Sequence, residues 1–195
     1  MKMSFIDQSR MGAYHIANNP ELYEPQRKNN FELQVTGLDD LISIYSTEFD
    51  KKKVANASEV IRIALAKGFI PNFAQEEIKV SYGNNDIKFA GKPQWQSGDL
   101  ALNDYIGAQT KEVMLAWQRQ SYDPKTQKVG RAKDYKHVAY LVEYAPDGEI
   151  VRTWKVFGCW IKELKFDDPS YENDGKQQMT ASISYDYAYP EIDED

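Results

Sequence analysis

Three side chains in this sequence could support nucleophilic or acid–base catalysis: His15, His137 and the single cysteine, Cys159. A nucleophilic site needs a histidine held beside a serine or a cysteine, and no spacing in the chain pairs either histidine with such a group. Cys159 stands between Gly158 and Trp160, and a buried thiol usually behaves as a small apolar side chain. The sequence therefore predicts a protein that is not an enzyme.

Metal and cofactor sites are not indicated either. The sequence has no Cys/His pair at ligand spacing, no calcium-binding loop pattern and no glycine-rich phosphate cradle. Its acidic pairs, Asp39-Asp40 and Asp167-Asp168, are neighbours along the chain, and adjacent side chains of a strand point to opposite faces. We expect no cofactor and no metal.

Length, composition and charge limit the remaining classes. The chain has 195 residues, of which 42% are hydrophobic, so one domain with a sizeable core is expected. Its net charge of −6 is the wrong sign for a protein that grips nucleic acid. No apolar run approaches the ~20 residues that span a bilayer, so no membrane partner is expected. A single cysteine cannot form a disulfide within the chain, which fits a reducing compartment. A soluble protein of a reducing compartment is predicted.

Breaker residues divide the chain into an N-terminal arm, residues 1–28, a single domain, residues 29–190, and an acidic C-terminal tail, residues 191–195. Alternating apolar and polar residues predict a sheet-rich domain. The predicted strands are residues 31–36, 59–67, 77–82, 86–90, 95–102, 137–144, 149–157, 160–166 and 178–187. Residues 83–85, Gly-Asn-Asn, predict a tight hairpin turn. Residues 46–58 are expected to form a long polar loop.

One segment has helical periodicity. A stripe at offsets of three and four residues predicts a helix whose free amides are capped by Asn103 or Asp104. The stripe consists of Ile106, Thr110, Val113, Met114 and Trp117. Together, the predicted strands and the predicted helix indicate a mainly β fold, an antiparallel β-barrel or sandwich with one packed α-helix. Aromatic residues reach 13%, which favours interfaces between subunits, and exposed strand edges favour pairing with another chain.

The stretch from residue 70 to residue 187 resembles the tail tube protein of contractile-tailed bacteriophages, which is related to the type VI secretion tube protein. The resemblance rests on the order and spacing of several pieces rather than on one motif. These pieces are Gly68-Phe69-Ile70-Pro71, the hairpin of residues 77–91, Ala116-Trp117-Gln118, residues 140–144, Gly158-Cys159-Trp160 and the run from Met179 to Asp186. Residues 30–38 also resemble the family's first strand. The arm before residue 29 and the insertion of residues 39–58 depart from the family.

The resemblance implies a structural virion protein that forms homohexameric rings. The rings stack into the inner tube of a contractile phage tail, the conduit for DNA ejection, with DNA as a non-specific passing cargo. Implied partners are other copies of the chain, the tail sheath protein, and the baseplate and tail-terminator proteins. The implied location is the phage tail, with synthesis in the bacterial host cytoplasm.

Two candidate sites follow from this interpretation. Thr180, Ser182, Ser184 and Asp186 would form a polar face toward the lumen, while Met179, Ala181, Ile183 and Tyr185 enter the core. A basic wall would hold the phosphates of DNA, so an acidic, hydroxyl-rich wall suits its passage. Lys51, Lys52 and Lys53 form the candidate inter-ring loop; the alternatives are a solvated loop face, which the acidic composition favours, and a nucleic-acid contact.

Other interpretations stay open. The same architecture could serve the tube of a contractile injection or type VI secretion-like machine, or a tail-terminus or baseplate protein. A more distant alternative is a monomeric β-sandwich that binds carbohydrate on a platform of Tyr and Trp side chains. The last alternative is an enzyme that uses one of the two histidines or a pair of carboxylates.

Overall fold

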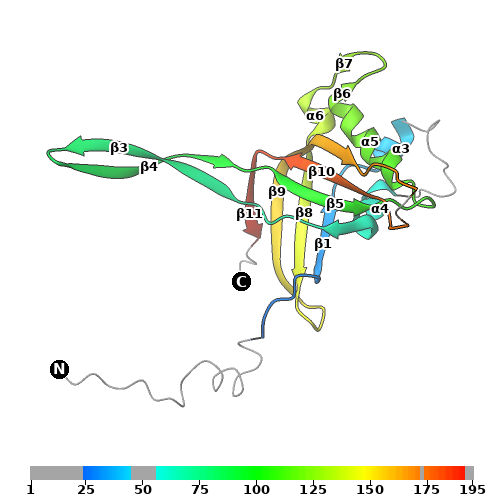
Figure 1. Cartoon of the computed structure of the whole chain (residues 1–195), viewed down its shortest axis with the longest axis horizontal. Helices are drawn as coiled ribbons and strands as arrows, with labels where there is room; N and C mark the ends of the chain where they lie inside the picture. The colour runs from blue at the N-terminus through cyan, green and yellow to red at the C-terminus, as the bar shows by residue number, and fades with distance from the viewer. Residues whose placement is uncertain (1–23, 45–55, 172–173, 192–195) are drawn as a thin grey trace.

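The computed structural model describes residues 24–44, 56–171 and 174–191. One curled antiparallel sheet dominates these residues (Figure 1). Its strands run in the order β1 (Phe31–Val35), β8 (His137–Tyr144), β9 (Ile150–Phe166), β10 (Gln178–Ser184), β5 (Gly98–Asn103) and β2 (Leu65–Lys67), and β11 (Tyr187–Glu191) also pairs with β9. Within the described residues, β1 and β2 stand at the two ends of this order and are edge strands.

The long strand β9 connects the two halves of the curl. Its first half pairs with β8 and with β11, and its second half pairs with β10. The change falls at Gly158, whose φ of +65° belongs to the left-handed region that favours glycine. One strand can therefore belong to both halves because it bends sharply at this residue.

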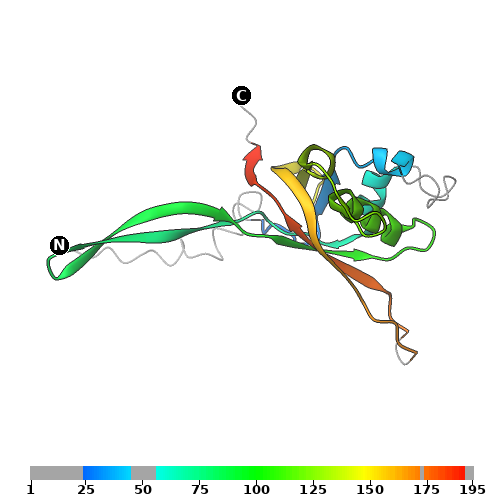
Figure 2. The same ribbon diagram turned by 90° about the horizontal axis from the view of Figure 1, so that it is seen from above.

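The four helices of the described residues gather on the side of the sheet away from the projecting hairpin of residues 73–95 (Figures 1 and 2). They are α3 (Asp40–Ile44), α4 (Ala57–Ala64), α5 (Thr110–Ser121) and α6 (Ala132–Tyr135). The helix α5 buries Val113, Met114 and Trp117 against the inner face of the sheet. The inward residues of the strands, such as Leu100 and Ile183, complete the core. No helix among the described residues is long and apolar enough to cross a membrane.

Two separate hairpins, one long and one short, complete the part of the fold that the structure describes. The first joins β3 (Phe73–Tyr82) and β4 (Asn85–Trp95) and projects well beyond the body of the molecule (Figures 1 and 2). The second joins β6 (Tyr122–Asp123) and β7 (Lys128–Val129) near the end of α5. The predicted mainly β, antiparallel fold class is confirmed. The predicted turn at Gly83 is also correct, although both of its strands are longer than the sequence indicated.

The predicted strand of residues 59–67 is wrong over most of its length. Residues 57–64 form α4, and the strand β2 covers Leu65–Lys67 alone. The side chain of Asn56 accepts a hydrogen bond from the backbone N–H of Glu59 at 3.0 Å, which caps the helix. Val60 and Ile61 are buried on the inward face of the helix. The structure thus has a second packed helix where the sequence was interpreted as a strand.

The predicted start of the other helix is also wrong. α5 begins at Thr110, and Ile106, the first member of the predicted stripe, is 92% exposed. Its N-cap position is Gln109 rather than Asn103 or Asp104. The final predicted strand ends at Ser184, so residue 187 belongs to β11 and not to the buried face of β10.

Candidate assembly surfaces

The β3–β4 hairpin carries a row of exposed apolar side chains. Across the hairpin Ile78 lies opposite Phe89, and Val80 lies opposite Ile87. Because side chains alternate between the faces of a strand, these four residues share one face, here called the apolar hairpin face. Each of them is 46–54% exposed. Exposed apolar clusters of this kind mark surfaces that another molecule covers.

The opposite face of the hairpin is polar. Lys79 lies opposite Lys88, and the Nζ atom of Lys88 is 3.1 Å from Oε2 of Glu77. Ser81 donates a hydrogen bond to Oδ1 of Asp86 at 2.9 Å. An isolated two-stranded hairpin is marginal in water, so its apolar face needs another surface to be stable. The two faces differ enough in character that we expect the apolar one to be the contact face.

An aromatic cluster holds the root of the hairpin. The rings of Phe73 and Trp95 lie 5.0 Å apart, and Trp95 lies 5.8 Å from the ring of Tyr185. The Tyr185 hydroxyl donates to the carbonyl oxygen of Asn72 at 3.2 Å, and burial raises the pKa of this phenol. Such offset and tilted ring pairs are favourable beyond their buried area. The direction in which the hairpin leaves the body is therefore fixed by packing at its base.

A second exposed surface lies on the outward side of β10. Thr180 and Ser182 point outward, while Met179, Ala181 and Ile183 are buried, as the sequence predicted. We call the outward residues of this region the polar sheet face. It consists of Asp99 on β5, Glu163 and Lys165 on β9, and Thr180, Ser182 and Ser184 on β10. The register places Ser182 between Asp99 and Glu163, so a hydroxyl lies between two carboxylates.

Asp186, the fourth predicted lumen residue, lies apart from the other three. It follows the end of β10, and its Oδ1 is 2.7 Å from Nζ of Lys136. Its backbone N–H donates to the carbonyl oxygen of Phe157 at 2.9 Å. A Cβ atom at Gly158 would collide with the Asp186 carboxylate. The structure therefore brings Thr180, Ser182 and Ser184 together and gives Asp186 a structural role at the bend of β9. Lys51, Lys52 and Lys53 lie outside the described residues.

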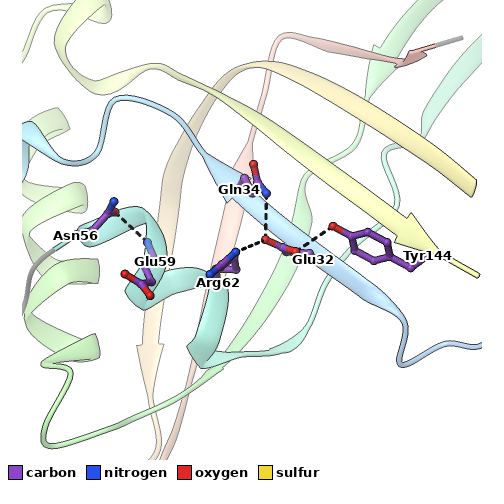
Figure 3. Close-up of polar contacts among 6 residues, drawn as sticks. All are labelled: Glu32, Gln34, Asn56, Glu59, Arg62 and Tyr144. Carbon is purple, nitrogen blue, oxygen red and sulfur yellow. Dashed lines mark hydrogen bonds and ion pairs between the residues drawn. The ribbon is translucent and has the colours of Figure 1, made fainter. Parts of the chain in front are cut away.

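A polar network fixes α4 to the edge strand β1. The Glu32 carboxylate on β1 accepts hydrogen bonds from Gln34 at 3.0 Å, from Arg62 of α4 at 3.1 Å and from the Tyr144 hydroxyl of β8 at 3.0 Å (Figure 3). Burial raises the pKa of Glu32, but the three donors outweigh it and hold the pKa below its ordinary value. Burial and the Glu32 carboxylate together raise the pKa of Tyr144. The network lets the helix cover part of an otherwise open strand edge.

His137 and Cys159, the two described candidates for catalysis, make hydrogen bonds to neighbouring backbone carbonyls and to α5. His137 is hydrogen-bonded through Nδ1 to the Thr36 carbonyl oxygen at 3.1 Å and through Nε2 to Gln120 at 2.8 Å. The Cys159 thiol donates to the carbonyl oxygen of His137 at 3.1 Å, and burial raises its pKa to about 12. A thiol with that pKa is not a nucleophile at neutral pH. Within the described ranges there is no group of three or more His, Cys, Asp or Glu that could hold a metal ion. His15 lies outside them.

The sequence pattern predicted the hairpin but not that its apolar face is a contact surface. The signal was present in the alternation of Ile78 and Val80 with Glu77 and Lys79. It was missed because a half-buried strand of the main sheet would show the same alternation. The projection of the hairpin away from the body is what distinguishes the two cases.

Solved structures with a similar fold come from contractile injection systems. A chain from the structure of the anti-feeding prophage tube-terminating cap superposes with a TM-score of 0.60 at 11% sequence identity, covering 86% of this chain and 91% of that one. A chain from the PVC sheath–tube complex in its extended state gives a TM-score of 0.59 at 13% identity, covering 92% and 97%. A chain from the PVC sheath/tube terminator gives 0.59 at 12% identity, covering 86% and 97%.

No family model matches the sequence, and a search of curated proteins finds no match. The likeness is thus one of fold, detected through the three-dimensional arrangement of the strands. It agrees with the resemblance to tail tube proteins that the order of the sequence pieces indicated.

Proposed function

We propose that this protein is the tube subunit of a contractile phage tail: copies form homohexameric rings, and the rings stack into the hollow inner tube through which DNA is ejected. The observation that carries the proposal is the apolar hairpin face. It projects from the body and is left exposed within one chain. The fold shared with chains of injection-system tube and terminator structures supports the same role.

A second copy of the chain is the partner that we assign to the hairpin. A contact between a hairpin and a different surface of the next copy is heterologous, and such contacts make closed rings or stacked assemblies when they repeat. Full burial of one large aliphatic or aromatic side chain contributes about 1.5–3 kcal/mol. Because the four side chains are about half exposed, covering them contributes roughly 3–6 kcal/mol per hairpin before the costs of association. A ring repeats this contact at each interface between copies, so the total stabilisation of the ring is larger than that of one contact.

The polar sheet face is our candidate for the lumen wall. Thr180, Ser182 and Ser184 offer small side chains on a regular sheet surface, and Asp99 and Glu163 flank Ser182. The one lysine of this face, Lys165, has its Nζ atom 3.3 Å from Oε1 of Glu163. A wall with paired cations does not hold DNA phosphates, which carry one charge per ~1.7 Å of duplex. In this proposal Asp186 lies beside the wall, where Lys136 neutralises it.

The remaining partners follow from a place inside a contractile tail. We propose that the tube contacts the sheath protein on its outer surface and the baseplate and terminator proteins at its ends. The protein would then reside in the virion after synthesis in the host cytoplasm, and its role would be structural rather than enzymatic. Lys51, Lys52 and Lys53 remain our candidates for contact with acidic groups of the next ring.

A second candidate function is favoured by the structures with a similar fold. Two of them are chains from the structures of a tube-terminating cap and of a sheath/tube terminator of injection systems. A terminator of such a machine would form one ring that stops, whereas a tube subunit adds ring upon ring. The length of the assemblies that the purified protein forms separates these two functions.

The hairpin gives a direct test. We would replace Ile78 and Val80 together by Asn and measure assembly by sedimentation velocity and by negative-stain microscopy. The proposal predicts that the concentration needed for rings or tubes rises roughly tenfold or more, because part of the contact energy is lost. The thermal unfolding of the monomer should change little, because both side chains are exposed and distant from the core.

The matched control is Lys79→Asn with Ser81→Asn, two changes on the same strand that fall on the polar face of the hairpin. These variants should assemble like the parent protein. Normal assembly of the Ile78→Asn/Val80→Asn protein would contradict the role given to the apolar hairpin face. If both double variants assemble poorly, the hairpin acts through its backbone rather than through the apolar hairpin face.

A further inference from the structure

An apolar groove of about 440 Å³ opens between the two edge strands of the main sheet, at the end where β1 begins. Its apolar lining comes from Phe31, Phe69, Ile70 and Leu141. These residues belong to β1, to β8 and to the segment that follows β2, so three separate parts of the chain build the groove. Ile70 is 56% exposed, whereas Leu141 is buried at 3%.

The groove exists because the cover provided by α4 stops short of it. Ser58 of α4 donates to the Val35 carbonyl oxygen at 2.7 Å, and Arg62 pairs with Glu32, so the helix covers β1 from Val35 to Glu32. Phe31, the first residue of β1, lies beyond these contacts. There the opposite edge comes close: a Cβ atom at Gly68 would lie 3.0 Å from the Phe31 ring. The two edges therefore meet at the floor of the groove, and its mouth stays open.

The rim of the groove is mostly basic. Arg27, Lys28 and Lys67 line it, and all three are exposed. Its one acidic residue, Glu143, lies 3.6 Å from the guanidinium of Arg152, which offsets its charge. An occupant with apolar side chains beside a carboxylate would match both the floor and the rim.

The sequence carries such a segment before the first described residue. The described residues begin at Glu24, two positions before Gln26, which lines the groove, and 23 residues precede them. Among these, Phe5 and Ile6 are followed at once by Asp7. We propose that the N-terminal segment, residues 1–23, docks in this groove of its own chain, with Phe5 and Ile6 on the apolar floor and Asp7 toward the basic rim.

The length of the chain allows this return. The 17 residues between Ile6 and Glu24 span up to roughly 60 Å when extended, so the segment can reach back to the groove from where the described chain begins. A tethered segment also has an effective concentration near the millimolar range, which a separate copy in dilute solution does not match. In the free subunit the groove is therefore filled within one chain, and this docking does not depend on the formation of a tube.

Disulfide trapping tests the docking in the full-length protein. In a Cys159→Ser background, Ile6→Cys is combined with Ile70→Cys, oxidised at low micromolar concentration and analysed on non-reducing gels with mass spectrometry. The matched control combines Ile6→Cys with Ile106→Cys, because Ile106 is 92% exposed and lies outside the groove. We expect an intrachain disulfide in the first protein and none in the control. Equal trapping in both proteins, interchain products or no trapping would overturn the proposal.

Limited trypsin digestion gives a second measurement that needs no new cysteine. Docking of Phe5, Ile6 and Asp7 protects the bond after Arg10, four residues from Ile6. Ile70→Asp places a charge on the groove floor and should raise the rate of cleavage at Arg10 roughly tenfold or more. Ile63→Asp, at a residue 60% exposed on α4, is the control and should leave the rate unchanged. The same rate in the parent and in Ile70→Asp would contradict docking in this groove.

Discussion

Gly158 shows how one residue shapes the sheet. Its φ of +65° belongs to a region that other residues rarely adopt, and the Asp186 carboxylate occupies the space where a Cβ atom would be. Lys136 holds that carboxylate through a contact of 2.7 Å. The sequence did not indicate that an aspartate lies beside this glycine. Residues 158 and 186 are 28 positions apart, so only the folded chain reveals their contact.

Replacing Gly158 by Ala should lower the free energy of unfolding by about 1–3 kcal/mol, because the new methyl group adds both backbone strain and a collision with Asp186. Urea denaturation followed by circular dichroism measures the change. Gly107→Ala is the control, since a Cβ atom there meets nothing within 4 Å. Equal stability of the Gly158→Ala protein and the parent would contradict this account of the bend.

Cys159 should be unreactive in the folded protein. Burial raises its pKa to about 12, so at pH 8 very little of the protein carries the thiolate that attacks a thiol reagent. Reaction with a chromogenic disulfide should therefore be slow in buffer and complete within minutes in concentrated urea. Fast modification without denaturant would show that the thiol is accessible, against its exposure of 1%.

His137 should make the stability depend on pH. Burial lowers the pKa of its imidazole below the ordinary value, although the hydrogen bond to Thr36 opposes this. The unfolded chain therefore takes up a proton below about pH 6.5 while the folded chain does not, and stability is lost as the pH falls. The slope from this group is at most about 1.4 kcal/mol per pH unit.

The test compares the free energy of unfolding at pH 7.5 and pH 5.5 for the parent and for His137→Asn. The substitution should lower stability at both values because hydrogen bonds of the ring are lost. The substitution should also make the decrease in the free energy of unfolding from pH 7.5 to pH 5.5 smaller than in the parent protein. An identical pH dependence in both proteins would assign the effect to other groups.

Among the elements, α4 shows where a sequence pattern allows two structures. Residues 59–67 alternate apolar and polar types well enough to predict a strand, yet Ala57, Val60, Ile61 and Ala64 also have helical spacing. The deciding signal was local: Asn56 followed three residues later by Glu59 is a helix-start pattern close to a capping box. By contrast, β8 was predicted with correct ends because its alternation is bounded by a turn signal at Pro146 and Gly148.

Asn56→Ala should destabilise the protein by about 1 kcal/mol, since the backbone N–H of Glu59 loses its acceptor. Asn56→Asp keeps an acceptor at the same position and should restore most of this loss. Thermal unfolding of the three proteins at one pH gives the comparison. If Asn56→Ala and Asn56→Asp unfold alike, the cap is not what stabilises the start of α4.

At the scale of the whole molecule, the order of strands along the chain predicted an antiparallel fold, and the solved structures with a similar fold agree with it. The curl of the sheet could not be predicted, because it depends on β9 pairing with three other strands. The groove could not be predicted either, because Phe31 and Gly68 meet only when both edges of the sheet come together. The polar alternation of β10 was visible from the start, since Thr180, Ser182 and Ser184 alternate with apolar residues.

Cryo-electron microscopy of the assemblies that the full-length protein forms tests most directly whether it is a tube subunit. We expect stacked rings around a continuous central channel, with Ile78, Val80, Ile87 and Phe89 of each copy covered by a neighbouring copy. Isolated chains, a fibre without a channel, or tubes in which these four side chains remain in solvent would contradict it.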